Sequence, residues 1–353
     1  MGDVFALTAE LVDVPSQSYA EAAIVELIEA RLRAAAHLEV TRVGDNLVAR
    51  THLGRDQRVI LAGHTDTVPA NGNDGARVDG DWLWGVGAAD MKGGLAVMLD
   101  AAVRQVHPAV DCTYVFYARE EVAAADSGLG ELFEARPDLL AGDLALLGEP
   151  TDAAIEAGCQ GTLRALVTLK GARAHTARPW MGRNAVHRLG PMLNALSDYE
   201  PRRPVLAGCE YREAMLAVSV GGGVAGNVVP DEATVLVGHR FAPDRSPEQA
   251  IDEVRSLLAP YLEPEDDFEV VELSDAAQPA VDHPLLARLI ERHHLEVRAK
   301  LGWTDVARFS AFGVPAANFG PGDAVLAHTA EERVSRSSVE RVAEVISDLL
   351  GSP

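Results

Sequence analysis

Cysteine is scarce in this chain. Its 353 residues include three cysteines, Cys112, Cys159 and Cys209, and no two of them form a Cys-x-x-Cys pair. Their odd number and wide spacing argue against a disulfide framework and against a zinc site built from thiolates. We therefore expect buried or free thiols in a protein of the reducing cytoplasm.

Basic residues and long apolar runs are scarce as well. Lysine and arginine total 31 against 53 aspartates and glutamates, which leaves a net charge of −22. Such a surface repels the phosphates of nucleic acids and anionic membranes. No stretch approaches the roughly 18 apolar residues of a membrane helix, and the N-terminal residues lack the basic region of a secretory signal. We expect neither nucleic acid nor a membrane as a partner.

What the chain does have is an alternation of strand-like and helical segments, in a length that favours two domains. Buried strands at 46–50, 58–64, 112–120 and 143–150, with a helix at 93–105, predict an α/β sheet covered by helices. Residues 160–275 follow the order β-α-β-β-α-β of a ferredoxin-like α+β unit. A helix at 284–299, a strand at 314–320 and a closing helix at 337–350 complete the prediction. The sequence thus predicts one domain, 1–159 and 276–353, with a second domain, 160–275, inserted into it.

Two motifs in the first half carry candidate ligands. In LAGHTDTVP (61–69), His64 and Asp66 are two residues apart at a strand end, so Asp66 can accept the second N–H of a metal-bound His64. A surface loop with an incidental pair explains this tripeptide equally well. Asp90 lies in the glycine-rich turn GVGAADMKGG (85–94), where a carboxylate can bridge two cations. A phosphate loop using Lys92 is the alternative, but the spacing differs from G-x-x-x-x-G-K-[ST].

Further acids and a histidine follow. Glu120 and Glu121 end a buried strand, where neighbouring residues point to opposite sides, so one can bind metal while the other faces substrate as a general base. Glu149 follows the next strand, and His328 lies in a loop before the last helix. Each taken alone has an ordinary structural explanation. Together, at the carboxyl ends of strands, they suit a catalytic zinc pair that keeps a position open for water.

The motifs GHTDTVP, GAADMKGG, Glu120–Glu121, GEPT and His328 resemble, in this order, those of the two-zinc metallopeptidases and deacylases. That family includes aminoacylase, acetylornithine deacetylase, carboxypeptidase-type peptidases and succinyl-diaminopimelate desuccinylase. The resemblance implies a zinc-peptidase-like catalytic domain with two Zn²⁺ per subunit, for which Co²⁺ can substitute. His64, Asp90 and Glu149 would hold one ion, and Asp90, Glu121 and His328 the other. Asp66 would orient His64, Glu120 would be the general acid/base, and the Asp90–Met91 peptide would be cis.

The same resemblance makes residues 160–275 a lid and dimerisation domain. It implies that His175 reaches across a homodimer to the oxyanion in the partner's site. Arg240 would clamp a carboxylate of the substrate, a small acyl amino acid, and Asn227 and Thr304 would be polar contacts. Arg178 stands where related enzymes carry an aromatic residue, and it could supply a cationic contact.

Within the family, the closest likeness is to the desuccinylase branch in its actinobacterial form. It rests on GCQGTLRA (158–165), RAHTARPWMGRNAVH (173–187), GGVAGNVVPD (222–231), HRFAPDRS (239–246) and LGWTDVARF (301–309). This likeness implies hydrolysis of N-succinyl-L,L-2,6-diaminopimelate in lysine and diaminopimelate biosynthesis. Gln160, Arg178 and the shortened loop 302–305 depart from other branches, so a deacylase of the acetylornithine type or a dipeptidase stays open. The retained Glu120 argues against a third reading, a non-catalytic binding protein.

Overall fold

A computed structural model describes residues 2–351, which divide into two units. The first unit contains residues 1–157, 279–298 and 308–353, and the second contains residues 158–278 and 299–307. The second unit thus begins two residues earlier and ends three residues later than the inserted domain expected from the sequence. It also includes the return segment 299–307, which the sequence analysis had assigned to the first domain.

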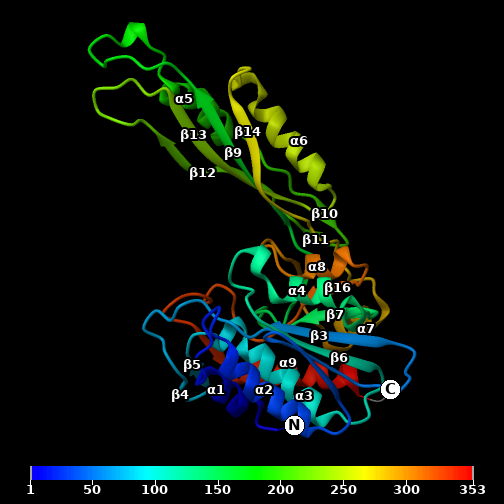
Figure 1. Cartoon of the computed structure of the whole chain (residues 1–353). Helices are drawn as coiled ribbons and strands as arrows, with labels where there is room; N and C mark the ends of the chain where they lie inside the picture. Colours follow the sequence, from blue (N-terminus) through cyan, green and yellow to red (C-terminus); the bar gives the residue numbers. More distant parts are fainter. Residues whose placement is uncertain (1, 352–353) are drawn as a thin grey trace. The chain divides into compact units, whose positions relative to one another are not determined.

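An eight-stranded mixed sheet forms the centre of the first unit (Figure 1). The central strands run parallel and the outer pairings seen at both sides are antiparallel. From one edge to the other, the strands are β1 (Glu39–Val43), β2 (Asn46–Arg50), β6 (Asp111–Tyr117), β3 (Arg58–His64), β7 (Leu144–Leu147), β16 (Ala316–Asn318), β8 (Ile155–Ala157) and β15 (Val297–Ala299). The run from Val59 to Ala62 is almost fully buried, as a central strand covered on both faces requires.

Helices cover both faces of this sheet. On one face lie α1 (Val4–Val12), α2 (Ala22–Ala34), α3 (Gly93–Arg104) and α9 (Arg336–Leu350), while α4 (Gly128–Ala135) lies on the other (Figure 1). Helix α7 (Pro284–His293) packs against α9. A second sheet of this unit joins β17 (Arg333–Ser335), β5 (Trp82–Trp84) and β4 (Arg77–Asp79).

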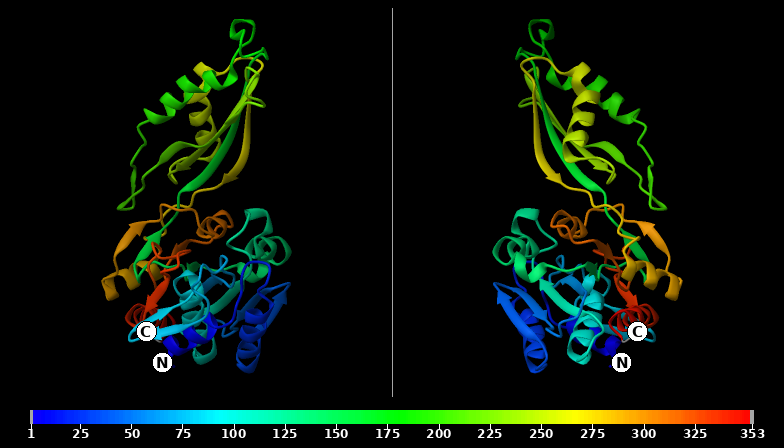
Figure 2. Two further views of the ribbon diagram at one scale, coloured as in Figure 1. Left: turned by 90° about the vertical axis from the view of Figure 1, so that its left-hand side faces the viewer. Right: turned by 90° about the vertical axis from the view of Figure 1, so that its right-hand side faces the viewer.

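The second unit has the ferredoxin-like order that the sequence predicts. Its elements are β9 (Gly161–Lys170), α5 (Ala185–Ser197), β12 (Ala214–Gly222), β13 (Glu232–Phe241), α6 (Pro247–Leu258) and β14 (Asp267–Ser274), with a small hairpin of β10 (Val205–Leu206) and β11 (Cys209–Glu210). The antiparallel sheet has the order β12-β13-β9-β14. Both helices lie on one face of it (Figure 2), where Leu189 and Val254 join a common core with Val237.

Two expected boundaries were wrong. The helix predicted at 284–299 ends at His293, because His294 takes a left-handed conformation (φ 50°) and Leu295 donates back to the carbonyl of Ile290. Residues 297–299 form β15 instead. The strand predicted at 112–120 stops at Tyr117, and Arg119 has a φ of 60°.

Two expectations from the composition can be compared with the structure. The three cysteines are buried free thiols, as expected. Among the described residues, every helix is too short or too polar to span a bilayer.

Candidate metal centre

The expected metal ligands gather at one edge of the first unit's sheet. Strands β6, β3 and β7 are parallel neighbours, so their carboxyl ends meet there. His64 is the last residue of β3, and Glu121 and Glu149 follow β6 and β7. Asp90 lies in the irregular turn Ala88–Lys92 before α3, and His328 lies in the loop before β17 with a φ of 64°.

Asp90 lies between the two histidines. Its Oδ1 is 3.1 Å from Nε2 of His64, and its Oδ2 is 3.5 Å from Nε2 of His328. The same His328 nitrogen is 2.8 Å from Oε1 of Glu121. Possible ligand atoms of His64, Asp90 and Glu121 all lie within 4.8 Å of one another. One carboxylate thus faces two imidazoles through separate oxygens, which is the arrangement that a bridging ligand needs.

The electrostatics of this group fit a cation. Burial opposes a charge on His64, but hydrogen bonds to Asp66 and Asp90 raise its pKa well above the ordinary value, and the charge of nearby Glu149 adds to the rise. Hydrogen bonds to Asp90 and Glu121 raise the pKa of His328 to about 10. The carboxylates therefore stabilise positive charge at this position. Divalent cations supply that charge and use the same imidazole nitrogens and carboxylate oxygens as ligands.

Asp66 lies beside His64 and contacts other segments as well. Nδ1 of His64 lies 3.0 Å from the main-chain oxygen of Asp66 and 3.5 Å from its carboxylate. That carboxylate accepts the backbone N–H groups of Glu120 (2.9 Å) and Glu121 (3.1 Å) and the hydroxyl of Ser18 (2.7 Å). Asp66 thus links the histidine to the loop that carries the two glutamates.

The Glu120–Glu121 pair lies beyond the strand that was expected to include it. Because β6 ends at Tyr117, strand alternation does not set the directions of these two side chains. Glu121 faces His328, and Glu120 is half-buried beside it. Between the strand end and the two glutamates, Arg119 has a φ of 60°.

The sequence analysis missed Glu332. Its side chain is 1 % exposed, and its Oε1 accepts the backbone N–H groups of Ala89 (3.1 Å) and Asp90 (3.0 Å). Burial raises the pKa of Glu332 to about 7, against the opposing effect of these backbone donors. Glu332 lies four residues after His328 beside another acid, so in the sequence it reads as part of a polar loop. It holds the turn on which Asp90 stands.

Two details of the Asp90 turn bear on the sequence analysis. The Asp90–Met91 peptide is cis, which confirms the expectation from the resemblance. Lys92 is 1 % exposed, and its Nζ donates to the carbonyl of Val14 at 2.7 Å. Lys92 is therefore part of the core. The alternative, a phosphate loop in which Lys92 faces a phosphate, does not fit this position.

The expected substrate contacts lie in the second unit, at two ends of its sheet. The N–H of Arg178 donates to the carbonyl of His175 (2.7 Å), and the N–H of Thr176 donates to that of Asn227 (3.0 Å), so these residues share one end. At the other end, Arg240 donates to the hydroxyl of Thr162, the second residue of β9. The carbonyl of Thr304 accepts from Cys159, just before β9.

The separation between these ends is that of a full strand. Strand β9 has ten residues, which span roughly 30 Å. Within one chain, therefore, the structure brings His175, Arg178 and Asn227 together, but it does not bring them to Arg240.

Comparison with known proteins decides the family. Residues 60–352 match the sequence profile of the peptidase family M20/M25/M40. The chain belongs to this family. It is thus a metal-dependent hydrolase of amide bonds.

Relatives are similar over nearly the whole chain. A protein of Mycobacterium tuberculosis, named provisionally as the succinyl-diaminopimelate desuccinylase DapE, is 48% identical over 99% of this chain and 98% of its own. The succinyl-diaminopimelate desuccinylase of Corynebacterium glutamicum is 42% identical over 99% of this chain and 96% of its own.

Solved structures of this family share the fold. A tripeptidase of Staphylococcus aureus superposes with a TM-score of 0.80 at 20% identity, covering 99% of this chain and 97% of its own. A Bacillus subtilis protein described as a dinuclear metal-binding peptidase of the M20 family gives a TM-score of 0.69 at 16% identity, covering 98% and 96%.

Proposed function

We propose that this enzyme hydrolyses N-succinyl-L,L-2,6-diaminopimelate to succinate and L,L-2,6-diaminopimelate, in lysine and diaminopimelate biosynthesis. The observation that carries the proposal is the end-to-end similarity, at 48% and 42% identity, to proteins that bear this activity in their names. The cluster of His64, Asp90 and Glu121 supports it, because a metal-dependent amidohydrolase needs such a set of ligands.

In this proposal the centre takes two zinc ions. His64, Asp90 and Glu149 would hold one, and Asp90, Glu121 and His328 would hold the other. Asp90 is suited to bridge them because its two oxygens already face different histidines. When bound there, two zinc ions would supply the chemistry of this step, lowering the pKa of a water molecule toward about 7 and polarising the scissile carbonyl.

Glu120 carries the proton in the reaction. As general base, its carboxylate takes a proton from the water that attacks the amide carbon. It returns this proton to the amide nitrogen when the C–N bond breaks, so that succinate and a free amine leave. Support for this role comes from Asp66, which accepts the N–H groups of both Glu120 and Glu121 and so fixes their backbones together.

The proposed enzyme is a homodimer formed through the second unit. Strand β12 is an edge strand on which Leu216, Val218 and Val220 are 51%, 53% and 53% exposed. An uncovered apolar edge of this kind promotes pairing with another strand, and a second copy offers the same edge. In a dimer, His175, Arg178 and Asn227 of one subunit can reach the other subunit's site, where they join Arg240 and Thr304. A dimer would thus bring together two groups of residues that lie roughly 30 Å apart within one chain.

A substrate panel tests the proposed function. The purified protein, loaded with zinc or treated with a chelator, is given N-succinyl-L,L-diaminopimelate, N-acetylornithine and simple dipeptides. We expect the highest kcat/KM with the succinylated substrate, and loss of activity with the chelator. Faster turnover of acetylornithine or of a dipeptide would reject the proposed substrate in favour of a related deacylase or dipeptidase.

Subunit mixing tests the dimer. His175→Ala and Glu120→Gln homodimers should both be inactive, because each lacks one part of every site. A mixed dimer contains one site with neither substitution, so mixing should restore up to about a quarter to a half of the wild-type rate, depending on exchange. Absence of any recovery, with exchange shown by mass spectrometry, would place His175 in its own subunit's site or outside catalysis.

A further inference from the structure

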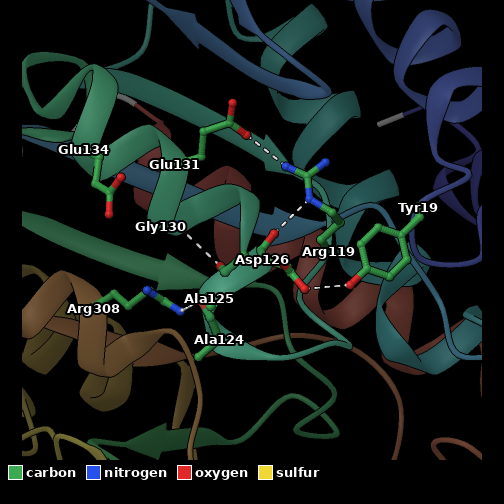
Figure 3. A pocket seen from close by; sticks show the side chains of 10 residues that line it. Tyr19, Arg119, Ala124, Ala125, Asp126, Gly130, Glu131, Glu134 and Arg308 are labelled. Atoms are coloured by element: carbon green, nitrogen blue, oxygen red, sulfur yellow. Dashed lines mark hydrogen bonds and ion pairs between the residues drawn. The ribbon is translucent and has the colours of Figure 1, made fainter.

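A pocket beside the Glu120–Glu121 pair contains two residues with unusual backbones. Tyr19, Arg119, Asp126, Glu131 and Arg308 are among the residues that line it (Figure 3). Tyr19 has a φ of 72° and Arg119 a φ of 60°, a region that residues other than glycine rarely adopt. Such conformations persist only where surrounding contacts hold them, and they gather at functional sites.

The side chain of Arg119 connects the start of the loop 119–126 to its end. Its Nε donates to the carbonyl of Asp126 at 2.8 Å, and its Nη2 donates to Oε2 of Glu131 in α4 at 2.9 Å. The guanidinium therefore joins the first residue of the segment 119–126 to its last residue and to a helix. A planar fork with fixed donors suits this double contact better than a lysine would.

Tyr19 ties the same loop to the N-terminal segment. Its hydroxyl donates to Oδ2 of Asp126 at 2.8 Å, and this hydrogen bond raises the pKa of Tyr19. The preceding residue, Ser18, donates to Asp66 at 2.7 Å, and Asp66 accepts the N–H of Glu121. Tyr19 thus contacts the last residue of the loop, and Ser18 is linked to the start of the loop through Asp66. Figure 3 shows Tyr19 and Arg119 turned toward Asp126 from opposite segments.

Hydrogen bonds to other segments also hold this loop, because Arg308 donates to the carbonyl of Ala124 at 3.0 Å and Asp66 accepts the N–H groups of Glu120 and Glu121. Its residues Ala123, Ala124 and Ala125 are exposed, so apolar burial contributes little to its position. The 2.8 Å contact between Glu121 and His328 nevertheless requires a defined position. The polar contacts of Arg119 and Tyr19 both meet Asp126 and therefore restrain the end of this loop that precedes α4.

We propose that Arg119 and Tyr19 are positioning residues that hold the loop 119–126 so that Glu121 meets the metal centre and Glu120 meets the substrate. The inference rests on the proposed function in giving Glu120 and Glu121 those roles. A misplacement of a catalytic group by about 1 Å can lower a rate about 100-fold, even when the substituted residue itself never touches the substrate.

Variants of both residues in the full-length protein test this inference. Arg119→Ala should lower kcat about 30- to 100-fold and weaken zinc binding, with KM changed less than about threefold. Tyr19→Phe removes a solvent-exposed hydrogen bond and should lower kcat about three- to tenfold. Asp126→Asn keeps an oxygen that accepts from Tyr19 and should stay within about twofold of wild type. Tyr199→Phe is the matched control, because it removes a 2.9 Å tyrosine–carboxylate bond to Glu253 in the second unit.

Arg119→Gly separates the side chain from the backbone. Glycine adopts a positive φ without strain but carries no guanidinium. We expect this variant to be as impaired as Arg119→Ala. A wild-type rate in Arg119→Gly would overturn the inference, since the φ alone would then matter. A rise in KM with kcat unchanged would also overturn it, because Arg119 would then be a substrate contact.

A measurement without substrate keeps the inference distinct from the proposed function. Amide hydrogen exchange of residues 119–127 should be at least about tenfold faster in Arg119→Ala and Tyr19→Phe, with the rest of the first unit unchanged. Unchanged exchange in this segment would refute the positioning role even if the enzyme is a desuccinylase. If wild-type protein fails to hydrolyse the succinylated substrate but exchange still rises locally, the proposed substrate is wrong and the positioning role stands. Should Arg119→Ala not fold, Arg119→Lys and Tyr19→Phe give the same comparison.

Discussion

Replacing Glu332 by alanine should weaken metal binding without any loss of a ligand. The carboxylate of Glu332 accepts two backbone N–H groups, those of Ala89 and Asp90, while the side chain is 1 % exposed. Each donor left without a partner in the interior costs about 1–3 kcal/mol. The two together come to about 2–6 kcal/mol, which the protein can avoid only by moving the Asp90 turn.

A shift of the Asp90 turn should lower the affinity for zinc. If about 3 kcal/mol of this loss falls on the metal-bound form, zinc binds roughly 100-fold more weakly, because 1.4 kcal/mol corresponds to a factor of ten. Competition titration of the metal-free protein against a chromophoric chelator measures that change. The rate at saturating zinc should fall as well, since Asp90 would no longer lie squarely between His64 and His328.

Two further variants sharpen the comparison. Glu332→Gln keeps the side-chain volume and an oxygen for both N–H groups, so its zinc affinity should fall by no more than about tenfold. Glu331→Ala removes the neighbouring acid, whose side chain is 70% exposed, and should leave zinc binding unchanged. Zinc affinity and kcat of Glu332→Ala within about threefold of wild type would refute the reasoning.

Three other predictions concern the proposed roles and the thiols. Glu120→Gln removes the proton carrier but no proposed ligand, so kcat should fall about 10²- to 10⁴-fold while zinc content is retained, and substantial remaining activity would reject Glu120 as the base. Arg178→Ala should raise KM for the succinylated substrate about tenfold or more, because a charge-assisted contact is lost. The control Arg136→Ala, which removes a surface ion pair with Asp138, should leave KM unchanged. Equal KM values for the two variants would show that Arg178 does not contact the substrate. Burial raises the pKa of Cys112 and of Cys159 to about 11, so at pH 8 both stay protonated and should react with Ellman's reagent only after unfolding; rapid labelling of the native protein would contradict their burial.

Local signals in the sequence were sufficient for most of the fold. Strand β3 reads as a buried strand because its apolar run has no polar face. The start of α6 is also set by neighbouring residues, since the structure has Ser246 and Gln249 in a capping box. Prediction failed where no residue type marks the end of an element. The helix α7 stops at a left-handed His294, and nothing in the residues HHLEV marks that stop.

At the metal centre, too, one part could be predicted from the sequence and another part could not. Metal chemistry requires imidazole and carboxylate side chains, so His64, Asp90, Glu121, Glu149 and His328 could be singled out by residue type and by their positions after strands. The residues that support them could not. Glu332 accepts two backbone N–H groups, and Ser18 donates to Asp66, in each case across a long distance in the sequence.

The sequence by itself determined the two-part architecture and the candidate ligand types, because apolar periodicity and residue chemistry are local properties, and its motifs carried the resemblance to the family. Only the tertiary structure decided how those ligands are held. It showed Asp66 supporting the glutamate loop as well as His64, Glu332 beneath Asp90, and Arg119 and Tyr19 meeting at Asp126. It also showed the expected substrate contacts at opposite ends of one sheet. The physical reason is that hydrogen-bond geometry and strand length act between segments that meet only after folding.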